Sequence, residues 1–305
     1  MEAVFLFNFP IPMFIQNLTD SIGNTPLLRL AKLFPDVAVY AKIEGVNPGG
    51  SIKDRAAFNM ITQAITRGEL TPAKTILEAT SGNMGIALAW LGASRGFKVA
   101  IVMSEAMSDE RKKMLKALGA ELILTPAAFG TAGAIAKAQE MLAANPKKYW
   151  FANQFNNPDN AAAYENTMGK ELLTDLPQID FLVGGVATAG TMVGLGKYFK
   201  KNSPATEVVG VLPPAGFKIQ GIQNHNEDFA AGLLDLGVID KEIAVTIEEA
   251  YDFARRISRE EGVFVGMSSG AALAAASKLT IPAGKNAVVI LPDRGEKYLS
   301  TDLYQ

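Results

Sequence analysis

Cysteine is absent from this 305-residue chain, and histidine occurs only once, as His225. The absence of cysteine excludes disulfides, thiolate metal sites and a cysteine nucleophile. A lone histidine cannot form a metal site by itself, so no metal site is expected. We interpret His225 as a polar loop residue.

A large excess of one charge and long apolar runs are also missing. The formal net charge is −2 and no basic block occurs, which argues against nucleic-acid binding. No run approaches the roughly 20 apolar residues of a membrane-spanning helix, so no membrane partner is expected. With 49% hydrophobic and 20% charged residues, the composition is typical of a folded soluble protein. A cytoplasmic location is expected, and the absence of cysteine fits it.

The first residues of the chain are apolar, but they do not fit a secretion signal. They carry no basic segment, and Pro10 and Pro12 interrupt them. Two interpretations stay open. Residues 1–12 form an N-terminal arm that packs on the body of the protein or on a partner subunit, or translation starts at Met13.

Short apolar runs alternate with helical patterns along the rest of the chain. The apolar runs are continuous, as expected for strands buried on both faces of a sheet. The expected strands are 39–43, 75–79, 99–103, 121–125, 181–186, 208–212 and 287–291. The expected helices are 51–67, 83–95, 108–118, 131–144, 161–173, 191–200, 246–261 and 269–277. This alternation predicts an α/β fold with mostly parallel sheets covered by helices.

The most informative segment is Asn47-Pro48-Gly49-Gly50-Ser51-Ile52-Lys53-Asp54-Arg55. Ser51 occupies a natural helix N-cap position, which places Lys53 in the first helical turn. The amino end of a helix carries partial positive charge and repels cations. In an apolar setting there, a lysine favours its neutral amine, the form that attacks carbonyls. We therefore predict that Lys53 is a Schiff-base lysine.

Two glycine-bearing turns predict anion sites. Each turn follows a strand-like run and precedes a helical one, an arrangement that presents backbone N–H groups to an anion. The turns are Thr80-Ser81-Gly82-Asn83-Met84-Gly85 and Gly184-Gly185-Val186-Ala187-Thr188-Ala189-Gly190-Thr191. An aldehyde-capturing lysine together with two anion sites suits pyridoxal phosphate holding an amino acid. One turn would bind the cofactor phosphate, and the other the substrate carboxylate.

In these segments and several others, the chain resembles the cysteine synthase (O-acetylserine sulfhydrylase) family of fold-type-II pyridoxal-phosphate enzymes. The resemblance extends from residue 22 to residue 301, with the blocks in the family's order. The further blocks are Gln154-Phe155-Asn156-Asn157-Pro158-Asp159-Asn160, Gly266-Met267-Ser268-Ser269-Gly270-Ala271 and Asp293-Arg294-Gly295-Glu296-Lys297-Tyr298-Leu299-Ser300-Thr301. The first and last of these look closest to the B-type cysteine synthases.

The resemblance implies a homodimer whose subunits contain two three-layer α/β domains, as in the tryptophan synthase β fold. The smaller, mobile domain would span residues 40–154. The larger domain, which anchors the cofactor, would combine 13–39 with 155–305. The cofactor would lie in the cleft between the domains, and binding of the substrate carboxylate would draw the smaller domain shut and exclude water.

The resemblance also assigns roles by position. Lys53 matches the catalytic lysine that forms the internal aldimine, and Asn83 matches the residue that hydrogen-bonds the cofactor's ring oxygen. Ser268 matches the hydroxyl that faces the pyridine nitrogen. The phosphate loop corresponds to Ala187, Thr188, Ala189, Gly190 and Thr191, and the substrate-carboxylate site corresponds to Thr80, Ser81, Asn83, Met84 and Gln154.

The implied reaction is a β-replacement that forms L-cysteine from O-acetyl-L-serine and sulfide, or another sulfur donor, through an α-aminoacrylate. Lys53, displaced by the substrate amine, would remove the α-proton. A neutral Ser268 hydroxyl makes the cofactor a weaker electron sink, which suits β-elimination and disfavours transamination. Other reactions of the same cofactor stay open, namely cysteine desulfhydration, cystathionine synthesis and serine dehydration. A non-catalytic family member that binds the cofactor is a further alternative.

Several positions depart from the family pattern. Met84 stands where the family usually has Thr, which predicts a changed substrate affinity or preference rather than inactivity. Ala187 and Ala189 replace the usual residues of the phosphate loop, so the loop requires both alanines in ordinary φ/ψ regions. Gln223, Asn224 and His225 lie where phosphoserine-using relatives carry arginines, which makes O-acetylserine the expected substrate.

Two further features have plain structural interpretations. Ser269 is expected to cap the helix that follows it. The segment 108–115 is expected to form an exposed amphipathic helix with charge pairs, and we assign it no functional role.

Overall fold

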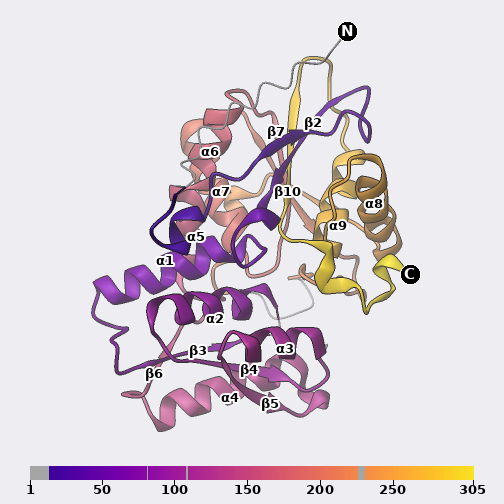
Figure 1. Cartoon of the computed structure of the whole chain (residues 1–305). Helices are drawn as coiled ribbons and strands as arrows, with labels where there is room; N and C mark the ends of the chain where they lie inside the picture. Colours follow the sequence, from indigo (N-terminus) through magenta and orange to yellow (C-terminus); the bar gives the residue numbers. More distant parts are fainter. Residues whose placement is uncertain (1–13, 81, 108, 226–230) are drawn as a thin grey trace.

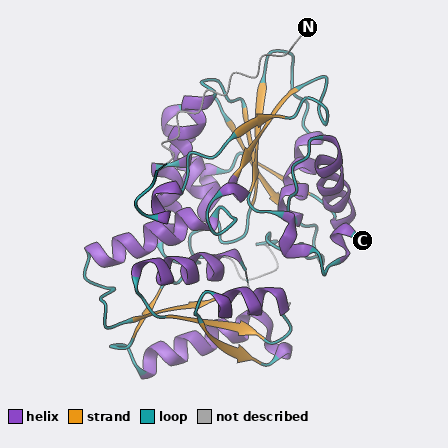
Figure 2. Cartoon of the chain, in the orientation of Figure 1, coloured by secondary structure: helices purple, strands orange, loops and turns teal. Residues whose placement is uncertain are grey.

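The computed structural model describes residues 14–80, 82–107, 109–225 and 231–305 (Figure 1). The proposed N-terminal arm, residues 1–12, and the proposed substrate-binding residue Ser81 therefore lie outside the described residues. Helices cover both faces of two separate sheets, as Figure 2 shows. The predicted α/β fold with mostly parallel sheets is confirmed.

The larger sheet has six strands in the order β1-β2-β10-β7-β8-β9. Its strands are parallel except for β1, which pairs antiparallel with β2. Their bounds are β1 Leu27–Arg29, β2 Ala38–Ile43, β7 Phe181–Gly185, β8 Glu207–Leu212, β9 Lys241–Ala244 and β10 Asn286–Leu291. In Figure 1, helices α8 (Ile247–Glu260) and α9 (Met267–Ser277) lie on one side of this sheet. Helices α5 (Pro158–Asn166), α6 (Met168–Asp175) and α7 (Gly190–Asn202) lie on the other side.

The smaller sheet has four parallel strands in the order β5-β4-β3-β6. Their bounds are β3 Thr75–Ala79, β4 Val99–Ser104, β5 Glu121–Thr125 and β6 Tyr149–Phe151. Helix α4 (Gly130–Ala144) packs on one face, and α2 (Asn83–Arg95) and α3 (Asp109–Ala117) pack on the other (Figure 1). Every residue of β3 and β4 is buried, as the continuous apolar runs predict.

The proposed division into two domains can be compared with these sheets. All six residues of β2 pair with β10 in the larger sheet, so a boundary at residue 40 would cut a strand of that sheet. The start of the smaller domain therefore belongs after β2. The division itself stays a prediction.

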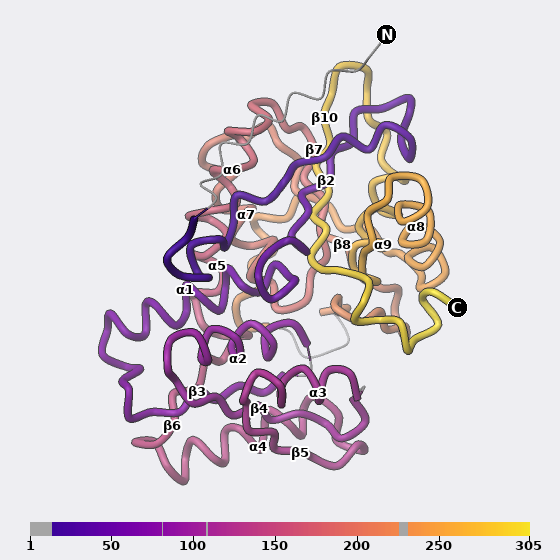
Figure 3. Tube along the Cα trace, in the orientation of Figure 1, coloured from indigo at the N-terminus to yellow at the C-terminus, as the bar shows by residue number. Residues whose placement is uncertain are grey.

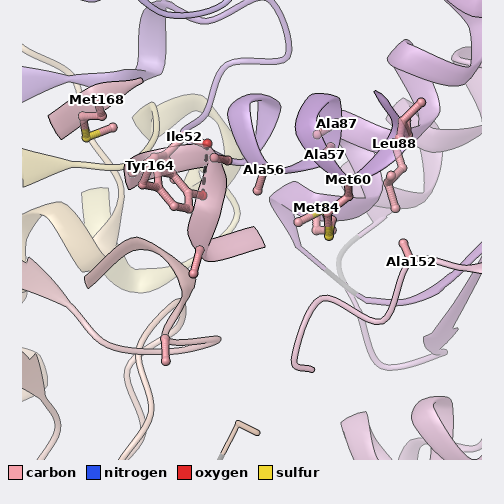
Figure 4. Close-up of a cluster of buried hydrophobic side chains, with 14 of the residues drawn as sticks. Ile52, Ala56, Ala57, Met60, Met84, Ala87, Leu88, Ala152, Tyr164 and Met168 are labelled. Carbon is pink, nitrogen blue, oxygen red and sulfur yellow. Dashed lines mark hydrogen bonds between the residues drawn. The ribbon is translucent and has the colours of Figure 1, made fainter. Parts of the chain in front are cut away.

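Helix α1 (Lys53–Thr66) packs against α2 and α5, between the two sheets. Its first turn is fixed by Arg55, a buried residue whose guanidinium forms ion pairs with Glu44 (Nε to Oε2, 2.8 Å) and Glu171 (Nη1 to Oε1, 2.6 Å). In the core cluster of Figure 4, the Tyr164 hydroxyl also donates to the Ile52 carbonyl oxygen at 3.4 Å. These contacts hold the start of α1, and with it Lys53, in one position.

One expected helix is divided in two. The pattern predicts a continuous helix over 161–173, but the chain forms α5 and α6, which are separated at Thr167. Thr167 has φ −121° and ψ −77°, and its hydroxyl donates to the Ala163 carbonyl oxygen at 2.6 Å. Arg55 Nη1 donates to the same hydroxyl at 3.2 Å. A side chain that bonds back to the preceding turn, and is itself bound from outside, replaces helix continuity at this point.

Helix α3 also differs from its expected exposure. Arg111 is only 5% exposed. Its guanidinium carbon lies 5.8 Å from the centre of the Tyr298 ring, and its N–H groups face the side-chain oxygen of Gln220. The helix at 109–117 therefore contacts segments that follow strands of the larger sheet through Arg111. Its other face is exposed and carries the Lys112–Asp109 ion pair, as expected for an amphipathic helix.

Candidate active site

Lys53 is the first residue of α1, and the loop before it is tied to the segment that follows β10. The Ile52 N–H donates to the Pro292 carbonyl oxygen at 2.8 Å, and Ser51 forms an isolated bridge with Asp293. Figure 3 shows the chain after β10 passing this loop. Ile52 occupies the N-cap, one residue later than predicted, while the Ser51 hydroxyl still accepts the Lys53 N–H at 3.3 Å.

The Lys53 amine lies against the second anion turn. Its Nζ is 3.3 Å from Thr188 Oγ1. Among the described residues it has no carboxylate partner, and desolvation by the surrounding protein lowers its pKa to about 8. An appreciable fraction of the amine is thus neutral near neutral pH, and burial is the cause.

The turn that contains Thr188 leads directly into α7. Ala189 is the N-cap of this helix and has φ +63°, in the left-handed region, so the requirement that both loop alanines have ordinary φ values fails at this residue. The Thr188 hydroxyl also accepts an N–H of the Asn160 amide at 3.3 Å. Thr191 lies in the first turn of the helix, directly after Gly190. The free backbone N–H groups at the start of α7 remain as anion donors.

The first anion turn follows β3 and lies close to Gln154. The Thr80 hydroxyl accepts the Gly82 N–H at 3.2 Å, which shapes the turn. Glu78, at the end of β3, accepts the N–H groups of Ala79 (2.9 Å) and Gln154 (3.2 Å). Burial raises the pKa of Glu78 to about 8. This carboxyl group was not identified from the sequence, although a charged residue inside a continuous apolar run was a signal of it.

Met84 follows the same turn but does not present its side chain to it. The residue is 1% exposed, and its side chain packs in the hydrophobic cluster beside Met60 and Ala57 (Figure 4). Only its backbone N–H, in the first turn of α2, is left for a ligand. Where the family usually has a threonine hydroxyl, this chain therefore has a methionine side chain that packs in the hydrophobic core.

Ser268 lies in the first turn of α9. The helix begins at Met267 with Gly266 as its N-cap and no side-chain cap, so the prediction that Ser269 caps this helix is wrong. Ser268 is buried, and its hydroxyl forms no hydrogen bond with the described residues. Gly221, at φ +96°, approaches it so closely that an added Cβ would lie 3.3 Å from Ser268 Cβ. The hydroxyl is thus confined, but it is free to meet a ligand.

The Asn83 side chain meets two charged residues from the C-terminal segment. Its Nδ2 donates to Asp293 Oδ2 at 2.7 Å, and its Oδ1 accepts from Lys297 Nζ at 2.8 Å. Neither Asp293 nor Lys297 was assigned a role from the sequence. They lie more than 200 residues from Asn83 along the chain, a distance over which motif spacing carries no information.

The single histidine lies outside this set of contacts. The His225 side chain is largely buried, and its Nε2 is 3.3 Å from Glu242 Oε1.

Within the described part of the chain, no group of three or more His, Cys, Asp or Glu residues could hold a metal ion. None of the helices described there is both long and apolar enough to cross a membrane.

These donors fit pyridoxal phosphate. The Lys53 amine, which has no counter-ion among the described residues, suits its aldehyde. The start of α7 with Thr188 suits its phosphate, and the Ser268 hydroxyl suits its pyridine nitrogen. Burying the Lys53 amine without a counter-ion costs folding free energy, which makes this lysine a candidate for a functional residue.

Comparison with known proteins also indicates a pyridoxal-phosphate enzyme. Residues 18–293 match the family model described as pyridoxal-phosphate dependent enzyme, and the chain belongs to this family. The family expected from the sequence is thereby confirmed.

More particularly, the chain is 44% identical to cysteine synthase A from Escherichia coli (strain K12), over 93% of this chain and 94% of that protein. The solved structure of O-acetyl serine sulfhydrylase isoform 3 from Entamoeba histolytica matches with a TM-score of 0.90 and 40% identity, over 97% and 93% of the two chains. The structure of an O-ureido-L-serine synthase matches with a TM-score of 0.90 and 37% identity, over 95% of each chain. The narrower resemblance to the B-type enzymes stays a prediction.

Proposed function

We propose that this protein is a cysteine synthase, which replaces the acetoxy group of O-acetyl-L-serine with the thiol of sulfide and releases L-cysteine and acetate. The observation that carries the proposal is the contact between Lys53 Nζ and Thr188 Oγ1, since it joins an amine of lowered pKa to an anion-binding turn. The near-full-length similarity to E. coli cysteine synthase A narrows the reaction to this β-replacement.

Each residue of the site has a role in this reaction. Bound pyridoxal phosphate supplies the electron sink that makes the α-proton of the substrate acidic. Lys53 Nζ accepts that proton, because a pKa of about 8 makes the amine an effective base near neutral pH. Thr188 and the backbone N–H groups at the start of α7, including those of Gly190 and Thr191, hold the phosphate.

The remaining residues bind the ring and the substrate. The Ser268 hydroxyl faces the pyridine nitrogen without a formal charge, which favours β-elimination over transamination. An Asn83 N–H is assigned to the ring oxygen. Thr80, Ser81, Gln154 and the backbone N–H groups of Asn83 and Met84 hold the substrate carboxylate at the start of α2. The absence of arginine from the segment at 218–225 favours O-acetylserine over phosphoserine.

The test is an assay of purified protein reconstituted with pyridoxal phosphate and mixed with O-acetyl-L-serine and sulfide. Formation of L-cysteine, lost in Lys53→Ala, is the expected result. Failure of the wild-type protein to take up pyridoxal phosphate would refute the proposal. Turnover with L-serine or L-cysteine but not with O-acetyl-L-serine would also refute it.

A different β-replacement is the second candidate. The structure with 37% identity is that of an O-ureido-L-serine synthase, and Met84 removes a side-chain hydroxyl from the substrate turn. The same assay decides between the two, with hydroxyurea supplied in place of sulfide. Faster turnover with hydroxyurea would favour the second candidate.

We also propose that the protein is a homodimer in the cytoplasm. Family resemblance supports both statements, and the exposed side chains of Phe14, Ile15 and Leu18 add an apolar surface near the start of the described chain. Light scattering coupled to size-exclusion chromatography tests the assembly, and a monomeric mass would contradict it.

A further inference from the structure

We propose that Lys297 is a positioning residue that fixes the orientation of the Asn83 amide and so reserves one Asn83 N–H for the ring oxygen of bound pyridoxal phosphate. The inference rests on the proposed function, because it concerns the same cofactor site. Lys297 belongs to the 3₁₀ turn Gly295–Tyr298 that follows β10.

The Lys297 ammonium is buried, and each of its three N–H donors has an acceptor. The residue is 9% exposed. Its Nζ lies 2.8 Å from Asn83 Oδ1, 3.0 Å from the Gly50 carbonyl oxygen and 3.4 Å from the Gly49 carbonyl oxygen. An ammonium group has three N–H donors and no acceptor. Each donor therefore has an acceptor, and two of the three acceptors belong to the loop that precedes Lys53.

These contacts determine which way the Asn83 amide faces. The carbonyl oxygen of the amide must lie on the ammonium, since that group can only donate. The NH₂ group then faces Asp293 and donates one N–H to Oδ2 at 2.7 Å. The second N–H remains for a ligand. The reversed amide would instead present a carbonyl oxygen to an electron-rich ring oxygen, and two acceptors repel each other.

Asp293 alone would not fix this orientation. Burial raises the pKa of the Asp293 carboxyl group, and the positive charge of Lys297 opposes that rise. A protonated Asp293 could donate to the amide oxygen and permit the reversed amide. The Tyr298 hydroxyl also donates to Asp293 Oδ2 at 2.7 Å, which supports the ionised form. Lys297 thus acts on Asn83 directly, and again through the charge state of Asp293.

The experiment compares Lys297→Met, Asn83→Ala and the double variant with the wild-type protein. Lys278→Met is the matched control, because it removes a surface lysine paired with Glu249. The measurements are the dissociation constant of pyridoxal phosphate from the apoprotein and the visible absorption spectrum of the bound cofactor. Lys297→Met is expected to weaken binding about 10-fold, the effect of one lost hydrogen bond to a charged group, and to shift the visible band.

The double variant separates positioning from general stabilisation. If Lys297 acts through Asn83, Lys297→Met adds little to Asn83→Ala, and both single variants shift the visible band in the same direction. Lys297→Arg, which keeps a charged donor, should restore most of the wild-type affinity. Lys297→Ala, which also removes every N–H donor of the side chain, replaces the methionine variant in this comparison if that variant does not fold.

Two results would overturn the inference. One is a Lys297→Met protein with wild-type affinity and spectrum, and the other is fully additive losses in the double variant, which would indicate a structural role independent of Asn83. Both leave the proposed function intact. Failure of the wild-type protein to bind pyridoxal phosphate would instead refute the proposed function.

Discussion

Apoprotein mixed with pyridoxal phosphate should capture the aldehyde at a rate that rises with pH and levels off above about pH 8, the pKa of Lys53. Only the neutral amine attacks a carbonyl, so the rate follows the neutral fraction of this side chain. At pH 7 a lysine with a pKa of 8 is about 10% neutral, whereas one with the ordinary value is about 0.03% neutral. Burial of Lys53 therefore raises the reactive fraction at pH 7 by about 300-fold.

Stopped-flow absorbance from pH 6 to pH 10 measures this rate, and borohydride reduction followed by peptide mapping identifies the labelled lysine. A free alkyl amine serves as the reference for an unburied group, and Lys53→Ala controls for capture elsewhere. A rate that climbs without a plateau to pH 10 would show that the amine is not desolvated. A label on another lysine would refute the assignment of Lys53.

Four further predictions concern the same region. Lys53→Met should stabilise the apoprotein by up to about 3 kcal/mol below pH 8. The reason is that the pKa of Lys53 is lower in the folded than in the unfolded state, so the protonated amine opposes folding. Denaturant unfolding should show that this gain disappears between pH 8 and pH 10.5. Glu78→Ala should lower the free energy of unfolding by about 2–4 kcal/mol, since the buried N–H groups of Ala79 and Gln154 lose their acceptor. The same variant should weaken O-acetylserine binding in a spectral titration. Replacement of an exposed glutamate, Glu121→Ala, is the control. Ala189→Gly should stabilise the protein by up to about 1 kcal/mol, because glycine relieves the cost of positive φ, and an unchanged or lower melting temperature would contradict this. Met84→Thr should cost about 2–4 kcal/mol without improving O-acetylserine affinity, since the side chain faces the core, and tighter binding in that variant would show that it faces the substrate turn.

The sequence predicts the buried strands well and the edge strands poorly. All seven expected strands occur within one residue of their expected ends. Six of them lie inside the two sheets, where strands covered on both faces form continuous apolar runs. The seventh, β5, is an edge strand with mostly exposed or half-buried residues, and its apolar run still predicts it. The strands β1, β6 and β9 were not expected. They have three or four residues each and lie at sheet edges, and β1 and β9 are mostly accessible to solvent, so neither length nor hydrophobicity marks them.

The site divides in the same way. Lys53 and the two anion turns could be predicted because each is a local pattern of loop, glycine and helix start. The Lys53–Thr188 contact joins residues 135 positions apart, near the starts of α1 and α7, and it depends on how these two helices both pack against α5. The φ value of Ala189 could not be inferred either, because an alanine is not expected in the left-handed region. Patterns of a few adjacent residues can thus be read from the sequence. Contacts between distant segments depend on how the helices and sheets pack, which the sequence pattern does not show.

Several ionisable groups in this region are buried, and burial makes their charged forms less stable than they would be in water. Burial lowers the pKa of Lys53 and Lys297 and raises that of Glu78, Asp293 and Asp54, the last to about 6. Groups buried in this way lower the stability of the fold unless a nearby opposite charge or a bound ligand interacts with them. They are common at functional sites. Lys297 and Asp293 partly compensate each other through their opposite charges, but Lys53 has no such partner among the described residues. A ligand that binds only the folded state and reacts with the amine would offset the cost of burying Lys53, and pyridoxal phosphate has an aldehyde that reacts in this way.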